Sequence, residues 1–196
     1  MQYIVGQLVI VMVFVLFIWG YYGGFNRIDI GESVPGGEII VYKKVTGSYK
    51  KTSTHMNEVY DSLMADFNIQ TTKGVAVYYD APDDVAEENL RSDVGCVIDD
   101  IEAIDQQTMT KIRQLWHVEM LPVAPSVVVE VPSRGKISVV VNMFRVHSKI
   151  KRYISSQGYQ KGALTEIYDM NANKIIYRQR IDGGGNHTEV VASWSK

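Results

Sequence analysis

The hydrophobic and polar positions of this chain follow two different periods, which predict alternating helices and strands. Spacing of i, i+3, i+4 and i+7 predicts helices over 52–67, over 136–157 and, shorter, over 108–116. Alternating or continuous apolar stretches predict strands over 38–46, 74–80, 91–98, 126–131, 164–169 and 174–181. Because the order strand-helix-strand-strand occurs twice, we expect an α+β fold. It would consist of duplicated SHS2-like units forming an antiparallel sheet with helices on one face.

One strand sequence occurs twice, and this indicates internal duplication. Residues 77–80 end the first unit, and residues 166–169 end a second unit placed 89 positions later. Two copies of this length predict pseudo-symmetric halves over 38–98 and 126–181, with a ligand-binding groove between them. In this alignment Val77 of the first copy is replaced by Glu166 in the second.

The N-terminal segment is the most apolar part of the chain. Residues 4–22 carry no charge, and a stretch of about 19 residues nearly spans a hydrocarbon core of about 30 Å. We therefore expect a transmembrane anchor over 1–24, with Trp19 at the membrane interface. A cleaved signal peptide fits less well because a basic n-region is missing. A buried core helix fits least, because the run has no polar face.

From the composition and length of the rest of the chain, we expect a linker over 25–37, one domain over 38–181 and a flexible tail over 182–196. Basic residues follow the anchor, so the positive-inside rule favours a single-pass membrane protein with a cytoplasmic C-terminal domain. The net charge of -2, with scattered Lys and Arg, predicts no nucleic-acid partner. The single cysteine, Cys96, excludes an internal disulfide.

The sequence predicts no metal and no cofactor. Its four histidines lack metal-ligand spacing, and the acidic residues over 80–88 do not match a calcium-binding loop. No glycine-rich turn from strand to helix is present to hold a phosphate.

Several strings of sequence resemble the gyrase-inhibitor-like (GyrI-like) family of effector-binding domains. They are residues 47–49, 74–82 and 90–95, and the family also has a Glu-Ile-Tyr strand like the one that starts at Glu166. The resemblance spans 38–181. With its N-terminal anchor the chain looks most like a membrane-anchored branch, which includes the animal testis-expressed ER-phagy receptor. The resemblance implies a groove that binds small, often cationic or aromatic, ligands, with Glu166 as its glutamate.

Glu166 is the residue for which we most expect a function. A carboxylate among aromatic rings suits an organic cation through charge pairing and cation–π attraction. Tyr168 shares its strand face by two-residue periodicity, and Tyr79 holds the equivalent place in the first half. Further candidates for lining the site are Tyr42, Tyr49, Trp116 and Phe144. The alternative is a solvated glutamate beside core aromatic residues.

Three functions fit these features. The first is a membrane-anchored, non-enzymatic domain that senses or sequesters a small amphipathic or cationic ligand. The second is a hydrolase with Glu166 as general base and Tyr168 or Tyr79 as proton donor. The sequence offers this hydrolase neither a second acid at a matched position nor a nucleophile paired with a base. The third is a protein-interaction module in which side chains fill the groove.

Overall fold

The computed structural model describes residues 2–182, excepting the side chains of residues 2–4 and 136. The described strands form one antiparallel sheet of eight strands in the order β1-β6-β8-β7-β3-β4-β2-β5. They are β1 (Gly31–Ser33), β2 (Ile39–Thr46), β3 (Lys73–Tyr78), β4 (Arg91–Val97), β5 (His117–Met120), β6 (Ser126–Pro132), β7 (Gln160–Asp169) and β8 (Lys174–Asp182). Of the predicted tail, only Asp182 is described, and it ends β8.

Within residues 2–182, four α-helices accompany the sheet: α1 (Gln2–Tyr21), α2 (Thr52–Phe67), α3 (Gln106–Leu115) and α4 (Lys136–Gln157). The predicted α+β class and antiparallel sheet are therefore confirmed, and α2 and α4 have the predicted bounds. Short 3-10 turns, η1 (Tyr49–Lys51) and η2 (Glu87–Asn89), lie on either side of β3 in the chain. The sequence did not reveal β1, which lies in the predicted linker, or β5.

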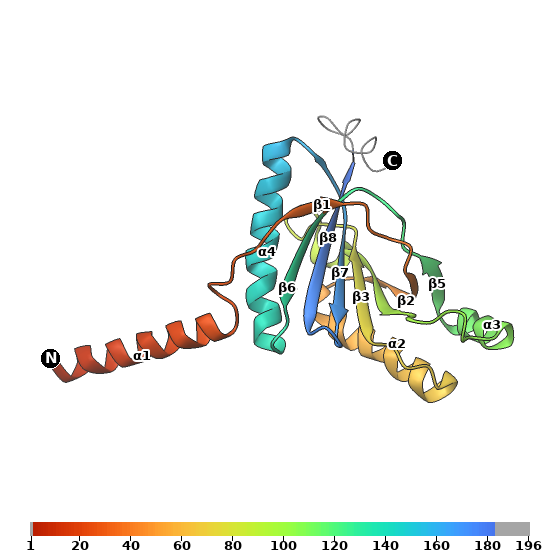
Figure 1. Cartoon of the computed structure of the whole chain (residues 1–196), viewed down its shortest axis with the longest axis horizontal. Helices are drawn as coiled ribbons and strands as arrows, with labels where there is room; N and C mark the ends of the chain where they lie inside the picture. Colours follow the sequence, from red (N-terminus) through yellow and green to blue (C-terminus); the bar gives the residue numbers. More distant parts are fainter. Residues whose placement is uncertain (1, 183–196) are drawn as a thin grey trace.

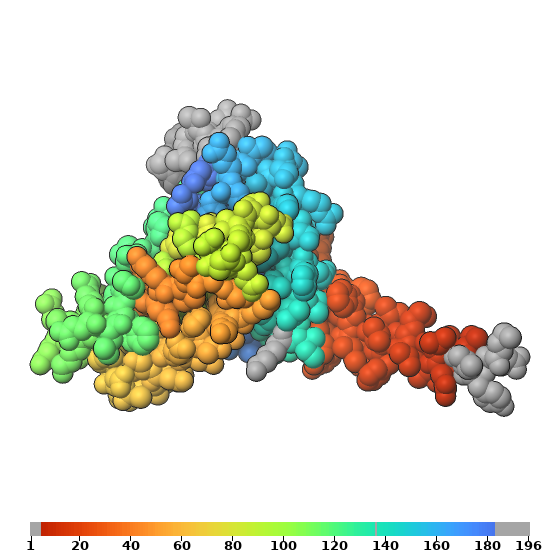
Figure 2. Space-filling view, turned by 180° about the vertical axis from the view of Figure 1, so that it is seen from behind, coloured from red at the N-terminus to blue at the C-terminus, as the bar shows by residue number. Residues whose placement is uncertain are grey.

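Helices α2 and α4 pack on the same face of the sheet. Val146 and Ile150 of α4 pack with residues of β6 and β8, and Leu63 of α2 packs with residues of β2 and β4. The strand register places these sheet residues on one face. Val41 pairs with Cys96, and the same row of paired residues continues through Gly74 of β3 to Tyr168 of β7. Figure 2 shows α2 in orange and α4 in cyan, with a segment of the β3–β4 loop between them.

The two halves are related by an offset of 90 residues. Helix α2 is capped by Asn68 and helix α4 by Gly158, both in the left-handed conformation with φ of 54° and 70°. Tyr78 and Tyr168 are also 90 positions apart. An alignment at 89 positions exchanges the two faces of the sheet, because neighbouring strand residues point to opposite sides. The counterpart of Glu166 is therefore Ala76, which lies directly opposite it on β3, and is not Val77.

The predicted transmembrane anchor over 1–24 is wrong. Helix α1 forms there and runs away from the rest of the molecule (Figure 1), but no helix among the described residues is both long and apolar enough to cross a membrane. The unbroken apolar run extends only from Leu8 to Trp19, and at about 1.5 Å per residue it reaches about 18 Å of the roughly 30 Å required. The predicted single-pass topology, membrane partner and membrane localisation are wrong for the same reason.

Candidate ligand-binding site at Glu166

Glu166 lies in the middle of the sheet, on the face that carries the helices. It belongs to β7 and is paired with Ala76 of β3 on one side and Tyr177 of β8 on the other. Only 4% of its surface is exposed. The alternative of a solvated strand glutamate is therefore wrong, and the carboxylate must find its partners inside the protein.

Two side chains contact the carboxylate directly. The Tyr168 hydroxyl donates a hydrogen bond to Oε2 at 2.5 Å, and Nε2 of His147 on α4 lies 3.1 Å from Oε1. The imidazole side chain is 42% exposed whereas that of Glu166 is buried, so His147 lies between the carboxylate and solvent. No Lys or Arg among the side chains that the structure describes forms an ion pair with Glu166.

Two further tyrosines surround Glu166. The pKa of each of Tyr78, Tyr168 and Tyr177 is raised well above the usual range of a tyrosine. Burial is the larger cause, and the charge of Glu166 is the second. These phenols therefore stay protonated at neutral pH. The Tyr177 hydroxyl is buried and has no hydrogen-bond partner among the described residues, and its ring meets His147 edge-on at 5.7 Å between centroids. The site thus combines one acid, four aromatic rings and an unused hydroxyl group.

Two of the predicted lining residues lie on the opposite face of the sheet. Tyr79 donates a hydrogen bond to Oδ2 of Asp93 at 2.6 Å, and the buried Tyr42 packs with Val75 and Val77. Both positions follow from strand alternation, since Tyr79 is adjacent to Tyr78. Neither side chain is brought to Glu166.

The other predicted lining residues have three different surroundings. Tyr49 borders the site, because its ring lies 4.7 Å from that of Tyr78. Trp116 packs in the cluster around α2 and α3, where its indole N–H donates to the Ser62 hydroxyl. Phe144 lies on α4 with 66% of its surface exposed. Of the predicted set, Glu166 and Tyr168 are in contact, and Tyr49 is at the border.

Sequence reasoning missed His147, Tyr78 and Tyr177. An offset of 90 positions would have identified Tyr78 as the counterpart of Tyr168. Tyr177 follows from the alternation of β8, since it shares a face with Ile175. His147 gave no signal, because a histidine on a helix is as compatible with solvent as with a buried acid.

The loop between β3 and β4 links the two halves beside this site. Asp83 forms an ion pair with Lys151 of α4 at 3.4 Å, and Glu87 forms one with Lys50, just before α2, at 3.3 Å. These pairs are exposed and screened by solvent, so they are weak. They place the loop between the helices without fixing it there.

Comparisons with known proteins identify the fold. No protein-family model and no curated protein matches the chain. Among solved structures, EcmrR in a DNA complex has a TM-score of 0.55 at 10% identity, covering 93% of this chain and 69% of that one. The EcmrR C-terminal domain has a TM-score of 0.53 at 10% identity, covering 81% and 98%. SAV2435 bound to tetraphenylphosphonium has a TM-score of 0.52 at 12% identity, covering 82% and 97%.

Identities this low show a shared fold alone. They support the resemblance to the GyrI-like family at that level, and they give no support to the membrane-anchored branch or to similarity with the ER-phagy receptor. The chain therefore shares its fold with the EcmrR C-terminal domain and with SAV2435.

Proposed function

We propose that this protein binds small organic cations at Glu166, between α2 and α4. The observation that carries the proposal is a buried carboxylate that has no Lys or Arg partner in the described part of the chain. Burying a charge is costly unless an opposite charge lies close to it. A ligand cation supplies that charge, and the surrounding tyrosine rings add cation–π attraction.

The position of His147 indicates how a cation reaches the acid. Because the imidazole lies between Glu166 and solvent, a ligand entering from that side displaces His147 and takes its place beside Oε1. Tyr168 keeps its hydrogen bond to Oε2 throughout. Binding without turnover suits a domain that senses or sequesters its ligand. The SAV2435 structure contains tetraphenylphosphonium, which makes this cation a suitable probe.

Calorimetric titration of the wild-type protein with tetraphenylphosphonium and with triphenylphosphine oxide tests the proposal. Both molecules carry phenyl rings on phosphorus, four in the cation and three in the oxide, but only the first carries a charge. We expect the cation to bind at least about tenfold more tightly, since charge pairing adds to ring contacts. Equal affinities would show that the site recognises aromatic surface alone and would contradict the role of Glu166.

Removal of the His147 side chain is expected to raise affinity. In His147→Ala the cation no longer has to displace the imidazole, so tetraphenylphosphonium should bind about tenfold more tightly in the same titration. Loss of the contact with Glu166 should also lower the free energy of unfolding by about 1–3 kcal/mol. His55→Ala is the matched control, because His55 contacts Glu58 on α2 in a similar way but at the surface. An unchanged affinity in His147→Ala would mean that the cation does not occupy the imidazole position.

A further inference from the structure

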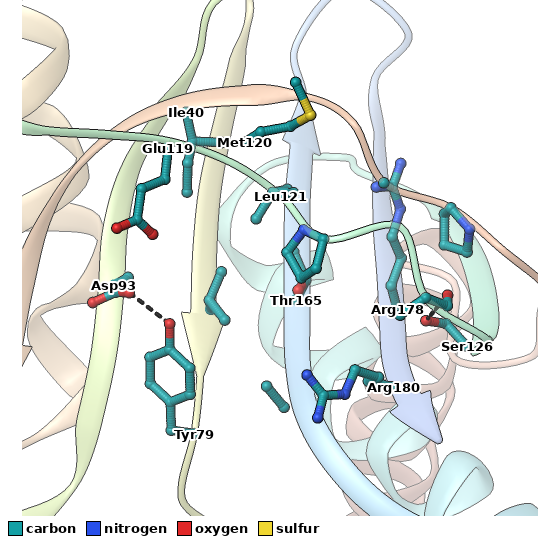
Figure 3. A pocket seen from close by; sticks show the side chains of 16 residues that line it. Ile40, Tyr79, Asp93, Glu119, Met120, Leu121, Ser126, Thr165, Arg178 and Arg180 are labelled. Carbon is teal, nitrogen blue, oxygen red and sulfur yellow. Dashed lines mark hydrogen bonds between the residues drawn. The ribbon is translucent and has the colours of Figure 1, made fainter. Parts of the chain in front are cut away.

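A cavity of about 110 Å³ lies on the face of the sheet opposite α2 and α4. Side chains of the central strands form its floor. The loop before β2 and the segment after β5, including Leu121 and Pro122, cover it (Figure 3). Glu166 is not among its lining residues, so this cavity is separate from the proposed cation site.

One row of residues crosses four strands beneath the cavity. Asp93 of β4 pairs with Val77 of β3, Val77 pairs with Thr165 of β7, and Thr165 pairs with Arg178 of β8. Adjacent strands are about 4.8 Å apart, so the α-carbons of Asp93 and Arg178 are about 14 Å apart. Across these four strands the row runs from an acid to a base, and on β2 it continues to the exposed Lys44.

The acid on this side of the cavity has a cation near it but no ion pair: Lys44 of β2 is the cross-strand neighbour of Asp93 and is exposed, and its charge acts on Asp93 without a salt bridge. Asp93 is only 8% exposed, and the Tyr79 hydroxyl donates to it. Figure 3 places Glu119 beside this pair. Burial raises the pKa of Asp93 above its usual range. No described Lys or Arg side chain forms an ion pair with Asp93.

The basic side is formed by Arg178 and Arg180 (Figure 3). Arg178 donates to Oε1 of Glu38 at 2.7 Å, and Arg180 donates to Oδ2 of Asp182 at 2.9 Å. A guanidinium group has five N–H donors, so both arginines retain donors for a further anion. Val77 and Thr165 line the cavity between the two charged sides.

We propose that this cavity binds a small zwitterion in which a short apolar chain joins an ammonium group to a carboxylate. The ammonium group contacts Asp93, and the carboxylate contacts Arg180 and the remaining donors of Arg178. The apolar chain lies over Val77, between the two sides. A ligand with a single charge would satisfy only one side of the cavity, so recognition requires both ends.

Amide chemical shifts of Val77 and Thr165 in two-dimensional NMR provide the test. The probes are 4-aminobutyrate, butylamine, which has only the positive end, and butyrate, which has only the negative end. We expect saturable shifts with 4-aminobutyrate and affinity at least about tenfold higher than for either single-charge probe. Asp93→Asn keeps the shape of the side chain and should weaken binding about tenfold, whereas the exposed control Arg152→Gln should not.

Arg180→Gln provides a second variant on the opposite, more exposed side, and it should weaken 4-aminobutyrate binding about tenfold without affecting butylamine. The proposal is overturned if 4-aminobutyrate causes no saturable shift, or if butylamine binds as tightly. Glu166→Gln should leave the affinity for 4-aminobutyrate unchanged, so failure at this cavity can be distinguished from failure of the cation site.

Discussion

The Glu166→Gln variant is expected to bind tetraphenylphosphonium at least about 30-fold more weakly than the wild type, as measured by calorimetric titration. Glutamine has nearly the same shape and can still contact Tyr168, so the change removes the charge and little else. Truncating one partner of a buried charge pair costs about 2–5 kcal/mol, and the lower value corresponds to about 30-fold in affinity. The neutral triphenylphosphine oxide should bind both proteins alike.

Glu130→Gln is the matched control for this experiment. Glu130 is also a strand glutamate, but it is exposed and pairs with Lys174 at the surface. Its substitution should leave cation affinity unchanged. Thermal unfolding of each variant without ligand separates loss of binding from loss of structure. A folded Glu166→Gln protein that binds the cation as tightly as the wild type would refute the charge-based site.

Gly95→Ala is expected to lower the free energy of unfolding by about 3 kcal/mol or more. Gly95 lies in β4 between Val75 and Tyr42. A Cβ atom there would lie 1.9 Å from the Val41 carbonyl oxygen and 2.7 Å from the Tyr42 α-carbon. Both atoms belong to the backbone of the neighbouring strand, so relief requires the strands to separate. Overpacking of a rigid core typically costs about 1–3 kcal/mol, and a backbone clash lies at or above that limit.

Urea unfolding followed by circular dichroism measures this loss. Gly31→Ala is the control, because Gly31 is also in a strand but a methyl group added there would meet no neighbouring atom within 4 Å. Its stability should change by less than about 1 kcal/mol. If Gly95→Ala were as stable as Gly31→Ala, β2 and β4 could not be packed this closely.

The long elements could be predicted from the sequence because local signals agree there. Helix α4 shows apolar periodicity along its length and ends at Gly158, which supplies the left-handed cap. Strands β1 and β5 gave no such signal. Each is a short edge strand that pairs with one neighbour, so tertiary context and not local pattern determines it.

Of the candidate site, only the contact between two residues of the same strand could be predicted from the sequence. Glu166 and Tyr168 are two positions apart, so alternation places them together. Contacts between elements depend on register and packing. The imidazole of His147 comes from a helix whose rotation the sequence does not specify. The pairing of Tyr79 with Tyr168 was wrong because a shift of one residue moves a side chain through the sheet.

The opposition of Ala76 and Glu166 determines how many ligands the site can hold. These positions are equivalent in the two halves and also face each other across β3 and β7, so the pseudo-two-fold axis passes between them. If both were glutamate, two carboxylates would lie about 5 Å apart in a buried site, and like charges at that separation are destabilising. Only one half can therefore carry the acid. A duplicated fold of this kind should bind one cation per chain, with a calorimetric stoichiometry of about one, as expected for a single buried charge.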